Sequence, residues 1–271
     1  MFRMLNGYDD IRLIVISLLL ASAFLFLLNR FWPSIHRRPH NDVIGWQLAI
    51  IGTIYAVVIG FMIFAVWGNF QAADMNVDNE ASALLNLFQD ADGLPAQQRD
   101  QIQSLSKQYA QVLIQKEWPM MNAGEKVDAG HPYLQQMWAT LIHTPATDAG
   151  EQIHLSHALD QLSALGQCRH IREMQNVASL PQILWDVLIG CGVITVVAAC
   201  FIGSENVRLH FLMMLALTAT VSLVLVAIAD IDDPFQGTVH IRSQAFVEAL
   251  STMNGHVTPQ SLPAASAPAS Q

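Results

Sequence analysis

Charged side chains are scarce in this sequence. Of its 271 residues, 13% are Asp, Glu, Lys or Arg, whereas 52% are hydrophobic, and the mean hydropathy is positive. An ordinary soluble domain carries about 25% charged residues. The shortage excludes a conventional water-soluble fold for the whole chain, because so much apolar surface cannot all be packed inside one core.

Basic residues are scarcer than acidic ones, and cysteine is scarce as well. The 13 Lys and Arg against 22 Asp and Glu give a formal net charge of -9. Nucleic-acid binding needs clustered Lys and Arg to neutralise phosphates, so we expect no nucleic-acid partner. The three cysteines, Cys168, Cys191 and Cys200, show neither a paired framework nor CxxC spacing. They predict no structural disulfide.

Catalytic signatures are also missing. The sequence contains no GxSxG, HExxH, GxxxxGK[ST] or GxGxxG motif. The sequence therefore offers no motif that would identify a catalytic residue, and we expect a protein that is not an enzyme and carries no cofactor.

Long apolar segments are what the sequence has instead. A bilayer core about 30 Å thick needs roughly 20 apolar residues in a helix. Four segments have that length, namely residues 11–32, 43–68, 183–203 and 209–229. The first could instead be a signal peptide cleaved after Ala21-Ser22-Ala23, but Asp9 and Asp10 replace the basic residues that such a peptide begins with. We predict four transmembrane helices.

The segment between the second and third spans has helical periodicity throughout. Val77, Ala81, Leu84 and Phe88 recur at steps of three and four, which predicts that the second span continues as one helix until Gly93-Leu94-Pro95. Further apolar patterns predict helices around residues 102–113, 134–142 and 153–165. The predicted fold is all-α, with four transmembrane helices and a helical soluble region inserted between the second and third spans.

This pattern gives a domain organisation. Residues 1–68 hold the first transmembrane pair, 69–180 the helical soluble region, and 181–237 the second transmembrane pair with the turn after it. A C-terminal segment follows at 238–258. Residues 259–271 are mostly Pro, Ala and Ser without charge, a composition typical of a disordered tail.

Small residues form a stripe on the second span. Gly52, Ala56 and Gly60 recur at steps of four and so lie on one side of a helix. Such stripes let helix backbones approach closely, either inside one subunit or in an oligomeric pore. Spacing alone favours packing inside one subunit.

A second, mostly apolar stripe lies beside the first. Thr53, Val57 and Phe61 also recur at steps of four. In a pore they would make a hydrophobic constriction that gates by excluding water. Elsewhere they would face lipid or a neighbouring span, and the periodicity leaves both alternatives open.

One histidine pair has a spacing that a metal could use. His154, His157 and Asp160 share a face of a predicted helix. A closed zinc site needs four ligands at characteristic spacing, and matching ligands are missing from the sequence. We expect these side chains to lie on a solvated helix face and predict no metal.

An aspartate cluster ends the fourth span, at Asp230, Asp232 and Asp233. A calcium ion needs six to eight oxygen ligands, and no further acidic residues stand nearby. We therefore expect a solvated cluster at the membrane interface.

Several motifs together resemble the bestrophin-like membrane domain family of unknown function. They are Tyr55-Ala56-Val57-Val58-Ile59-Gly60-Phe61, Trp67, Val77-Asp78-Asn79-Glu80-Ala81, Tyr109, Glu117-Trp118-Pro119, Arg169 with Arg172, Leu180-Pro181, Leu184-Trp185 and Pro234-Phe235-Gln236-Gly237. That family is similar in layout to bestrophins, which are pentameric anion channels whose second span lines the pore. The resemblance matches Phe61 to a gating aromatic and places Val57 and Thr53 at the two preceding neck positions.

The resemblance also sets limits. Val57 and Thr53 are smaller or more polar than the bestrophin pattern, and the acidic residues precede Pro234 instead of following Gly237. Calcium regulation is therefore not implied. What is implied is a homo-oligomer, as in the bestrophin pentamer, in the lipid bilayer of a bacterial inner membrane. The implied ligand is a small anion, and the soluble region would be cytoplasmic.

Two functions remain open at this stage. One is an oligomeric anion channel or permeation pathway. The other is a non-conducting membrane scaffold or sensor whose helical domain binds a partner. The scarcity of charged groups within the spans favours the second, because such groups commonly mark ion routes. Hydrophobic constrictions nevertheless conduct in some channels.

Overall fold

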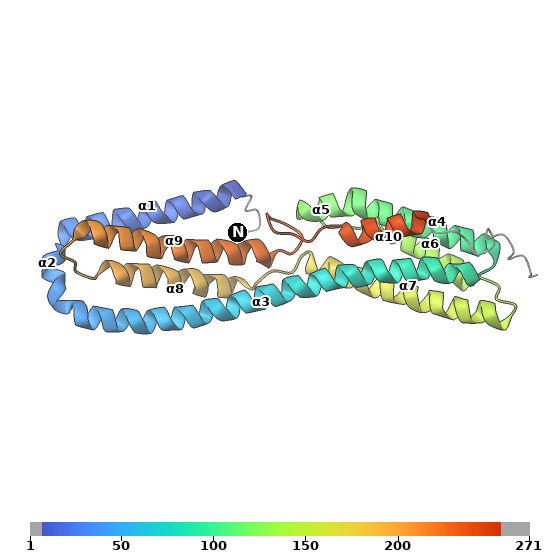
Figure 1. Cartoon of the computed structure of the whole chain (residues 1–271), viewed down its shortest axis with the longest axis horizontal. Helices are drawn as coiled ribbons and strands as arrows, with labels where there is room; N and C mark the ends of the chain where they lie inside the picture. Colours follow the sequence, from blue (N-terminus) through green and yellow to red (C-terminus); the bar gives the residue numbers. More distant parts are fainter. Residues whose placement is uncertain (1–6, 256–271) are drawn as a thin grey trace, which may run out of the picture. The chain divides into compact units, whose positions relative to one another are not determined.

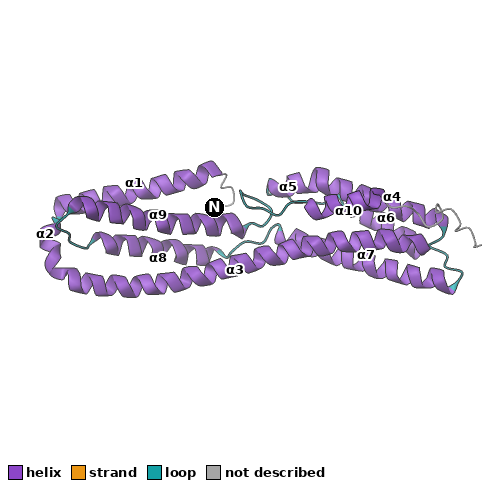
Figure 2. Ribbon diagram, in the orientation of Figure 1, coloured by secondary structure: helices purple, strands orange, loops and turns teal. Residues whose placement is uncertain are grey.

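The computed structural model describes residues 7–255, and its regular elements there are all helices (Figures 1 and 2). The predicted disordered tail at 259–271 lies outside the described residues. The chain divides into two compact units, one of Met1–Gln71 with Ala178–His240 and one of Ala72–Val177 with Ile241–Gln271. We call the first the membrane unit and the second the soluble unit.

The membrane unit contains the four predicted spans. Among residues 7–255, four helices are long and apolar enough to cross a bilayer. They are α1 (Gly7–Phe31), the first part of α3 (Asn41–Asp90), α8 (Gln182–Cys200) and α9 (Val207–Asp232). A short α2 (Ser34–Arg37) and a 3-10 turn (Arg38–His40) join α1 to α3. The prediction of four transmembrane helices is confirmed.

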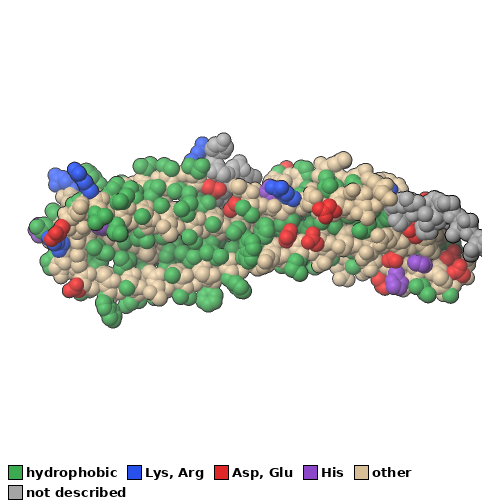
Figure 3. Space-filling view, viewed as in Figure 1, with side chains coloured by type: hydrophobic (Ala, Val, Ile, Leu, Met, Phe, Trp, Pro, Cys, Tyr) green, Lys and Arg blue, Asp and Glu red, His purple; other side chains and the backbone are tan. Residues whose placement is uncertain are grey.

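Apolar side chains cover the membrane unit on the face seen in Figure 3. Phe26 is 70% exposed and Phe31 is 82% exposed in the single chain. Such exposure would be costly in water, at about 25 cal/mol for each Å² of apolar surface, but not in hydrocarbon. The surface therefore fits a lipid environment.

Helix boundaries in this unit follow local chemistry. Pro33 follows α1, and Pro181 precedes α8, positions where a missing N–H costs little. At the start of α9 the Asn206 side chain accepts a hydrogen bond from the Leu209 N–H at 3.1 Å.

One side of α3 is buried inside the membrane unit. Met62 and Val66 pack with Trp185 and Leu188 of α8 and with Ile228 of α9. A second core cluster joins Leu25 of α1, Ala199 and Cys200 of α8, and Met214 of α9. These two cores leave the opposite side of α3 uncovered by any other part of residues 7–255.

Helix α3 continues out of the membrane unit without a break. It runs for 50 residues, from Asn41 to Asp90, and a 3-10 turn at Ala91–Gly93 ends it before Pro95. No Pro lies between Trp67 and Asp92 to interrupt the hydrogen-bond ladder. The predicted continuation past Trp67 is confirmed.

The soluble unit is helical, as predicted. After α3 come α4 (Ala96–Val112), a π-helical turn (Leu113–Glu117), α5 (Trp118–Asn122), α6 (His131–Ile142), α7 (Ala149–Gln175) and α10 (Gln244–Gly255). Helix α10 returns to this unit, where Phe246 packs edge-on against Trp118 with ring centroids 5.5 Å apart. The Trp118 indole N–H also donates to the Ile241 carbonyl at 3.1 Å.

Two of the aspartates that end α9 accept hydrogen bonds from backbone N–H groups. Asp232 accepts from the Leu180 N–H at 3.0 Å, and Asp230 accepts from the Thr238 N–H at 2.8 Å. Gly237 adopts a φ of 78°, the left-handed turn that glycine allows. The expectation of a merely solvated cluster is wrong for Asp230 and Asp232, because the turns on either side bring unpaired N–H groups to them.

Candidate functional site

Helix α3 presents an uncovered face along the membrane unit, which we call the α3 outer face. Its exposed residues are Trp46, Ala49, Ile50, Thr53, Ala56, Val57, Gly60, Phe61, Phe64 and Trp67. Val57 is 53% exposed, Phe61 71% and Phe64 77%. The structure thus places Thr53, Val57 and Phe61 together on a face that no other part of residues 7–255 covers.

Around the helix axis, the exposed residues of this face are centred near Thr53 and not near Phe61. At about 100° per residue, Phe64 lies about 20° from Thr53 around the helix, whereas Phe61 lies about 80° away. Val57 and Gly60 are also close to the centre by this geometry. Phe64 is therefore a candidate that the sequence reasoning missed. The seven-residue steps from Thr53 to Gly60 and from Val57 to Phe64 could have indicated it.

The glycines of α3 face open space in the single chain. A Cβ added at Gly52 or at Gly60 meets no atom within 4 Å, and the same holds at Gly45 and Gly68. The interpretation favoured by spacing, close packing inside one subunit, is therefore wrong for Gly52 and Gly60. It failed because α8 and α9 pack on the other side of α3. Packing of Gly52, Ala56 and Gly60 against another subunit stays a prediction.

A separate cavity of about 510 Å³ lies inside the membrane unit and is lined by α1, α8 and α9. Its walls are almost wholly apolar, and its Ser17 and Ser222 hydroxyls hydrogen-bond to each other at 2.6 Å. A bare ion there would lose its hydration without gaining a charged partner. The α3 outer face also lacks charged groups, but its exposure along the membrane unit would let other subunits complete a passage beside it, so it is the surface considered for permeation.

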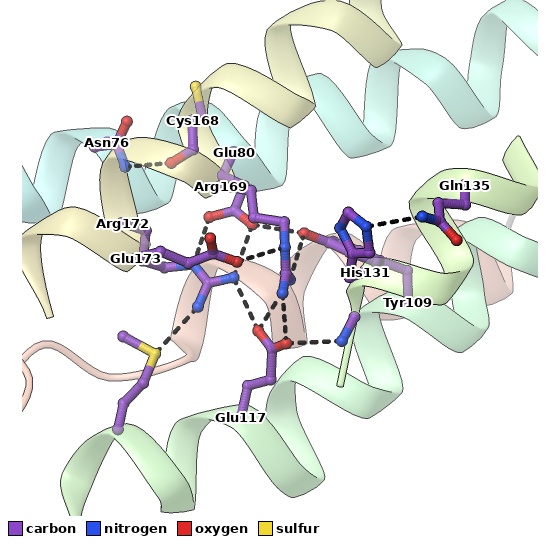
Figure 4. Close-up of polar contacts among 12 residues, drawn as sticks. Asn76, Glu80, Tyr109, Glu117, His131, Gln135, Cys168, Arg169, Arg172 and Glu173 are labelled. Atoms are coloured by element: carbon purple, nitrogen blue, oxygen red, sulfur yellow. Dashed lines mark hydrogen bonds and ion pairs between the residues drawn. The ribbon is translucent and has the colours of Figure 1, made fainter. Parts of the chain in front are cut away.

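The soluble unit is built around a buried ion-pair cluster (Figure 4). Glu80 of α3, Tyr109 of α4, Glu117 at the end of the π-helical turn, and Arg169 and Arg172 of α7 meet there, all at most 3% exposed. These five residues contain two guanidinium groups and two carboxylates, and the partly exposed Glu173 pairs with Arg169 Nε at 2.8 Å at the edge of the cluster. The formal charge of the buried part is balanced, which is how buried charges are tolerated.

Every carboxylate oxygen in this cluster has a donor. Glu80 accepts from Arg172 at 2.6 and 3.1 Å and from the Tyr109 hydroxyl at 2.8 Å. Glu117 accepts from Arg169 at 2.9 and 3.1 Å, from Arg172 at 3.0 Å, and from the Gly130 N–H at 2.7 Å. No carboxylate oxygen of Glu80 or Glu117 is left without a donor to serve as a general base. The contacts instead link α3, α4 and α7 of the soluble unit.

The pKa shifts in the cluster agree with that structural role. Burial and the nearby Glu80 charge raise the pKa of Tyr109 well above its ordinary value. Burial alone would raise the pKa of Glu117, but hydrogen bonds from Arg169 and the charge of Arg172 outweigh it and lower the pKa. Tyr109 thus stays neutral and Glu117 stays ionised at physiological pH.

The histidines considered for metal binding do not form a site. His154 packs against the backbone at Gly93, where an added Cβ would lie 2.1 Å from the ring. His157 and Asp160 are exposed. Among the described residues, no group of three His, Cys, Asp or Glu side chains is arranged to hold a metal ion.

The fold and its uncovered helix define a class: a four-span helical membrane protein with a helical insertion between the second and third spans. The chain belongs to the bestrophin-like family, because the family model for the Bestrophin-like domain matches residues 15–246. The predicted family is therefore confirmed. No curated protein matches the chain.

Solved structures share this fold. A bacterial bestrophin homologue from Klebsiella pneumoniae is 14% identical, with a TM-score of 0.67, covering 90% of this chain and 99% of that chain. A point mutant of a bacterial bestrophin homologue from the same organism is 15% identical at the same TM-score and coverage. A structure described only as a mutant membrane protein is 15% identical with a TM-score of 0.65 and the same coverage.

Proposed function

We propose that this protein assembles as a homo-oligomer in a bacterial inner membrane and forms an anion-permeable pore lined by α3. The observation that carries the proposal is the α3 outer face, which runs through the membrane unit without a partner from the described residues of its own chain. In a ring of subunits, a face of this kind lines the symmetry axis or packs on a neighbour. The narrowest level would lie near Thr53, Val57, Phe61 and Phe64.

The composition of the α3 outer face supports this arrangement. The open positions at Gly52 and Gly60 allow a neighbouring helix to approach closely. The exposed rings of Phe61 and Phe64 would narrow an axial passage to an apolar neck. Such necks can control conduction by excluding water.

The charge pattern of α3 gives no support to cation selectivity. No Asp or Glu occurs between Asp42 and Asp74, so the membrane part of α3 holds no carboxylate ring of the kind that selects cations. Membership of the bestrophin-like family supports anions as the permeant ions. From the bestrophin layout we further propose that the soluble unit is cytoplasmic and that about five copies form the oligomer.

A membrane scaffold or sensor is the second candidate. It is favoured by the lack of Lys and Arg as well as Asp and Glu between Asp42 and Asp74. Without charged groups a pore has little to stabilise a dehydrated ion. On this alternative the α3 outer face would contact lipid, and the soluble unit would bind another protein.

A paired experiment separates the two candidates. The mass of the detergent-purified complex gives the subunit number, and liposomes containing the protein are tested for chloride and potassium flux. The channel predicts a closed ring and a chloride flux that exceeds the potassium flux. If the protein is a monomer, or a ring that passes neither ion at any voltage or pH tested, the channel proposal is wrong and the scaffold is supported.

A further inference from the structure

Arg37 of α2 is a fully buried charge without an acidic partner in the part of the chain that the structure describes. Its side chain is 0% exposed. One terminal nitrogen donates to the Cys200 carbonyl at 2.5 Å, and the other donates to the Asn29 side-chain oxygen. Both acceptors are neutral. No carboxylate within residues 7–255 forms an ion pair with Arg37, although buried guanidinium groups are normally paired.

The acidic side chain that pairs with the neighbouring residue, Arg38, is not available to Arg37. Glu205, in the loop between α8 and α9, pairs with Arg38 instead. The carbonyl end of α8 offers Arg37 only the partial charge of a helix terminus, about half a unit. The positive charge of Arg37 is therefore left only partly compensated.

His210 of α9 reaches the same helix end. It is 9% exposed, and its ring lies within hydrogen-bonding reach of the backbone of Ala199, the residue before Cys200. Arg37 and His210 therefore contact the backbone of adjacent residues in the last turn of α8. Each also keeps one buried nitrogen without a partner in the described chain, Nε of Arg37 and Nε2 of His210.

We propose that Arg37 and His210 form a binding site for a small inorganic anion, chloride in the first instance, at the α2 end of the membrane unit. The Nε–H of Arg37 always donates, and Nε2 of His210 donates when the ring is protonated, a form that a bound anion stabilises. A water molecule would satisfy these nitrogens but would leave the charge of Arg37 uncompensated. A halide does both.

The number of free donors favours a compact anion. Among the described residues, Arg37 and His210 offer one unpartnered buried nitrogen each. A phosphate, free or on a lipid headgroup, would bring further oxygens that need donors of their own. The site uses no residue of the α3 outer face, so it stands apart from the proposed pore and can be tested without measuring flux.

The test measures halide binding to the intact protein. Thermal unfolding of the detergent-purified chain is followed as sodium chloride replaces sodium gluconate at constant ionic strength. We expect a Tm that rises and then saturates with chloride, because a ligand that binds only the folded state stabilises it. Crystals soaked in sodium bromide should show an anomalous peak between Arg37 and His210.

Two variants and a control assign the effect. Arg37→Met should abolish the chloride-dependent rise, whereas Arg38→Met, which removes a partly exposed neighbour, should leave it intact. If Arg37→Met does not fold, His210→Asn provides the second test. Its amide can replace the bond to Ala199 but lacks Nε2, so the chloride concentration for half-saturation should rise several-fold.

Three outcomes would overturn the proposal. The first is an equal chloride response in Arg37→Met and Arg38→Met. The second is a bromide-soaked crystal with no anomalous peak beside Arg37. The third is stabilisation by inorganic phosphate or by an anionic-lipid micelle without any response to chloride, which would assign the site to a phosphate group. A saturable chloride response in a protein that conducts no ion would support the site and refute the pore.

Discussion

Glu80 and Arg172 form a two-point ion pair although 92 residues separate them along the chain. Arg172 Nε lies 2.6 Å from one carboxylate oxygen of Glu80, and Nη2 lies 3.1 Å from the other. Both side chains are 0% exposed. The pair joins the soluble part of α3 to α7, and Arg172 extends the cluster to Glu117 at 3.0 Å.

Removing Arg172 should destabilise the soluble unit strongly. Arg172→Met leaves the buried Glu80 carboxylate without its charged partner, which commonly costs about 3–5 kcal/mol. We expect a large fall in the denaturant midpoint followed by circular dichroism. Lys116→Met, at an exposed site in the same unit, should change little. The double variant Glu80→Met with Arg172→Met should recover much of the loss, because Glu117 and Arg169 still balance each other. No recovery would contradict this pairing.

Acid should weaken the same cluster through Glu117. Its pKa is lower in the folded protein than in the unfolded chain, so the stabilisation is present above about pH 4.3, the ordinary value for Glu. It is lost as the pH falls through the folded pKa. Unfolding free energies measured between neutral and acidic pH should therefore decline less steeply in Glu117→Gln, which is already destabilised at pH 7. Parallel profiles for the two proteins would refute the assignment.

The small residue at position 56 should be required for assembly. Ala56 is exposed in the single chain, between Gly52 and Gly60 on α3. If another helix packs there, Ala56→Leu overfills the contact, at a cost of about 1–3 kcal/mol. Native gels and light scattering should then show dissociated protein. Ala23→Leu makes the same change on the exposed side of α1 and should assemble normally. Assembly of Ala56→Leu like the parent would show that this face contacts lipid.

Gly192 should be needed for α3 to pack on α8. A Cβ at Gly192 would lie 2.8 Å from the Tyr55 hydroxyl oxygen and 3.2 Å from a methyl group of Val221. We expect Gly192→Val to cost about 1–3 kcal/mol and to lower the Tm of the purified protein. Gly190→Val is the matched control, because an added Cβ there meets no atom within 4 Å in the described chain. Equal Tm values for the two variants would contradict the close approach.

Shortening the aromatic side chains of the proposed neck should ease ion passage. Phe61→Ala and Phe64→Ala each widen an apolar constriction and so lower the free energy of a hydrated anion within it. Chloride efflux from liposomes should be faster for both variants than for the parent. The larger increase is expected for Phe64→Ala, because Phe64 lies nearer the centre of the α3 outer face. Phe26→Ala, on the exposed side of α1, serves as the control. Equal efflux from the parent and all three variants would contradict the placement of Phe61 and Phe64 in the neck.

The four spans, the long α3 helix and the helical nature of the soluble unit could all be predicted from the amino-acid sequence alone. These features depend on length, composition and periodicity within one segment, and each is a local property of the chain. The apolar stripe of Thr53, Val57 and Phe61 could be recognised for the same reason. Tyr109, Glu117, Arg169 and Arg172 were visible only as scattered motifs.

Which side of each helix is covered, and which distant charges meet, depends on how the helices pack in three dimensions. Periodicity places Gly52 and Gly60 on one stripe, but only the packing of α8 and α9 on the opposite side of α3 left that stripe open. Likewise, the partnership of Glu80 with Arg172 and the isolation of Arg37 depend on contacts between segments far apart in the chain. Such contacts are set by the packing of whole helices, so no local pattern in the sequence could specify them.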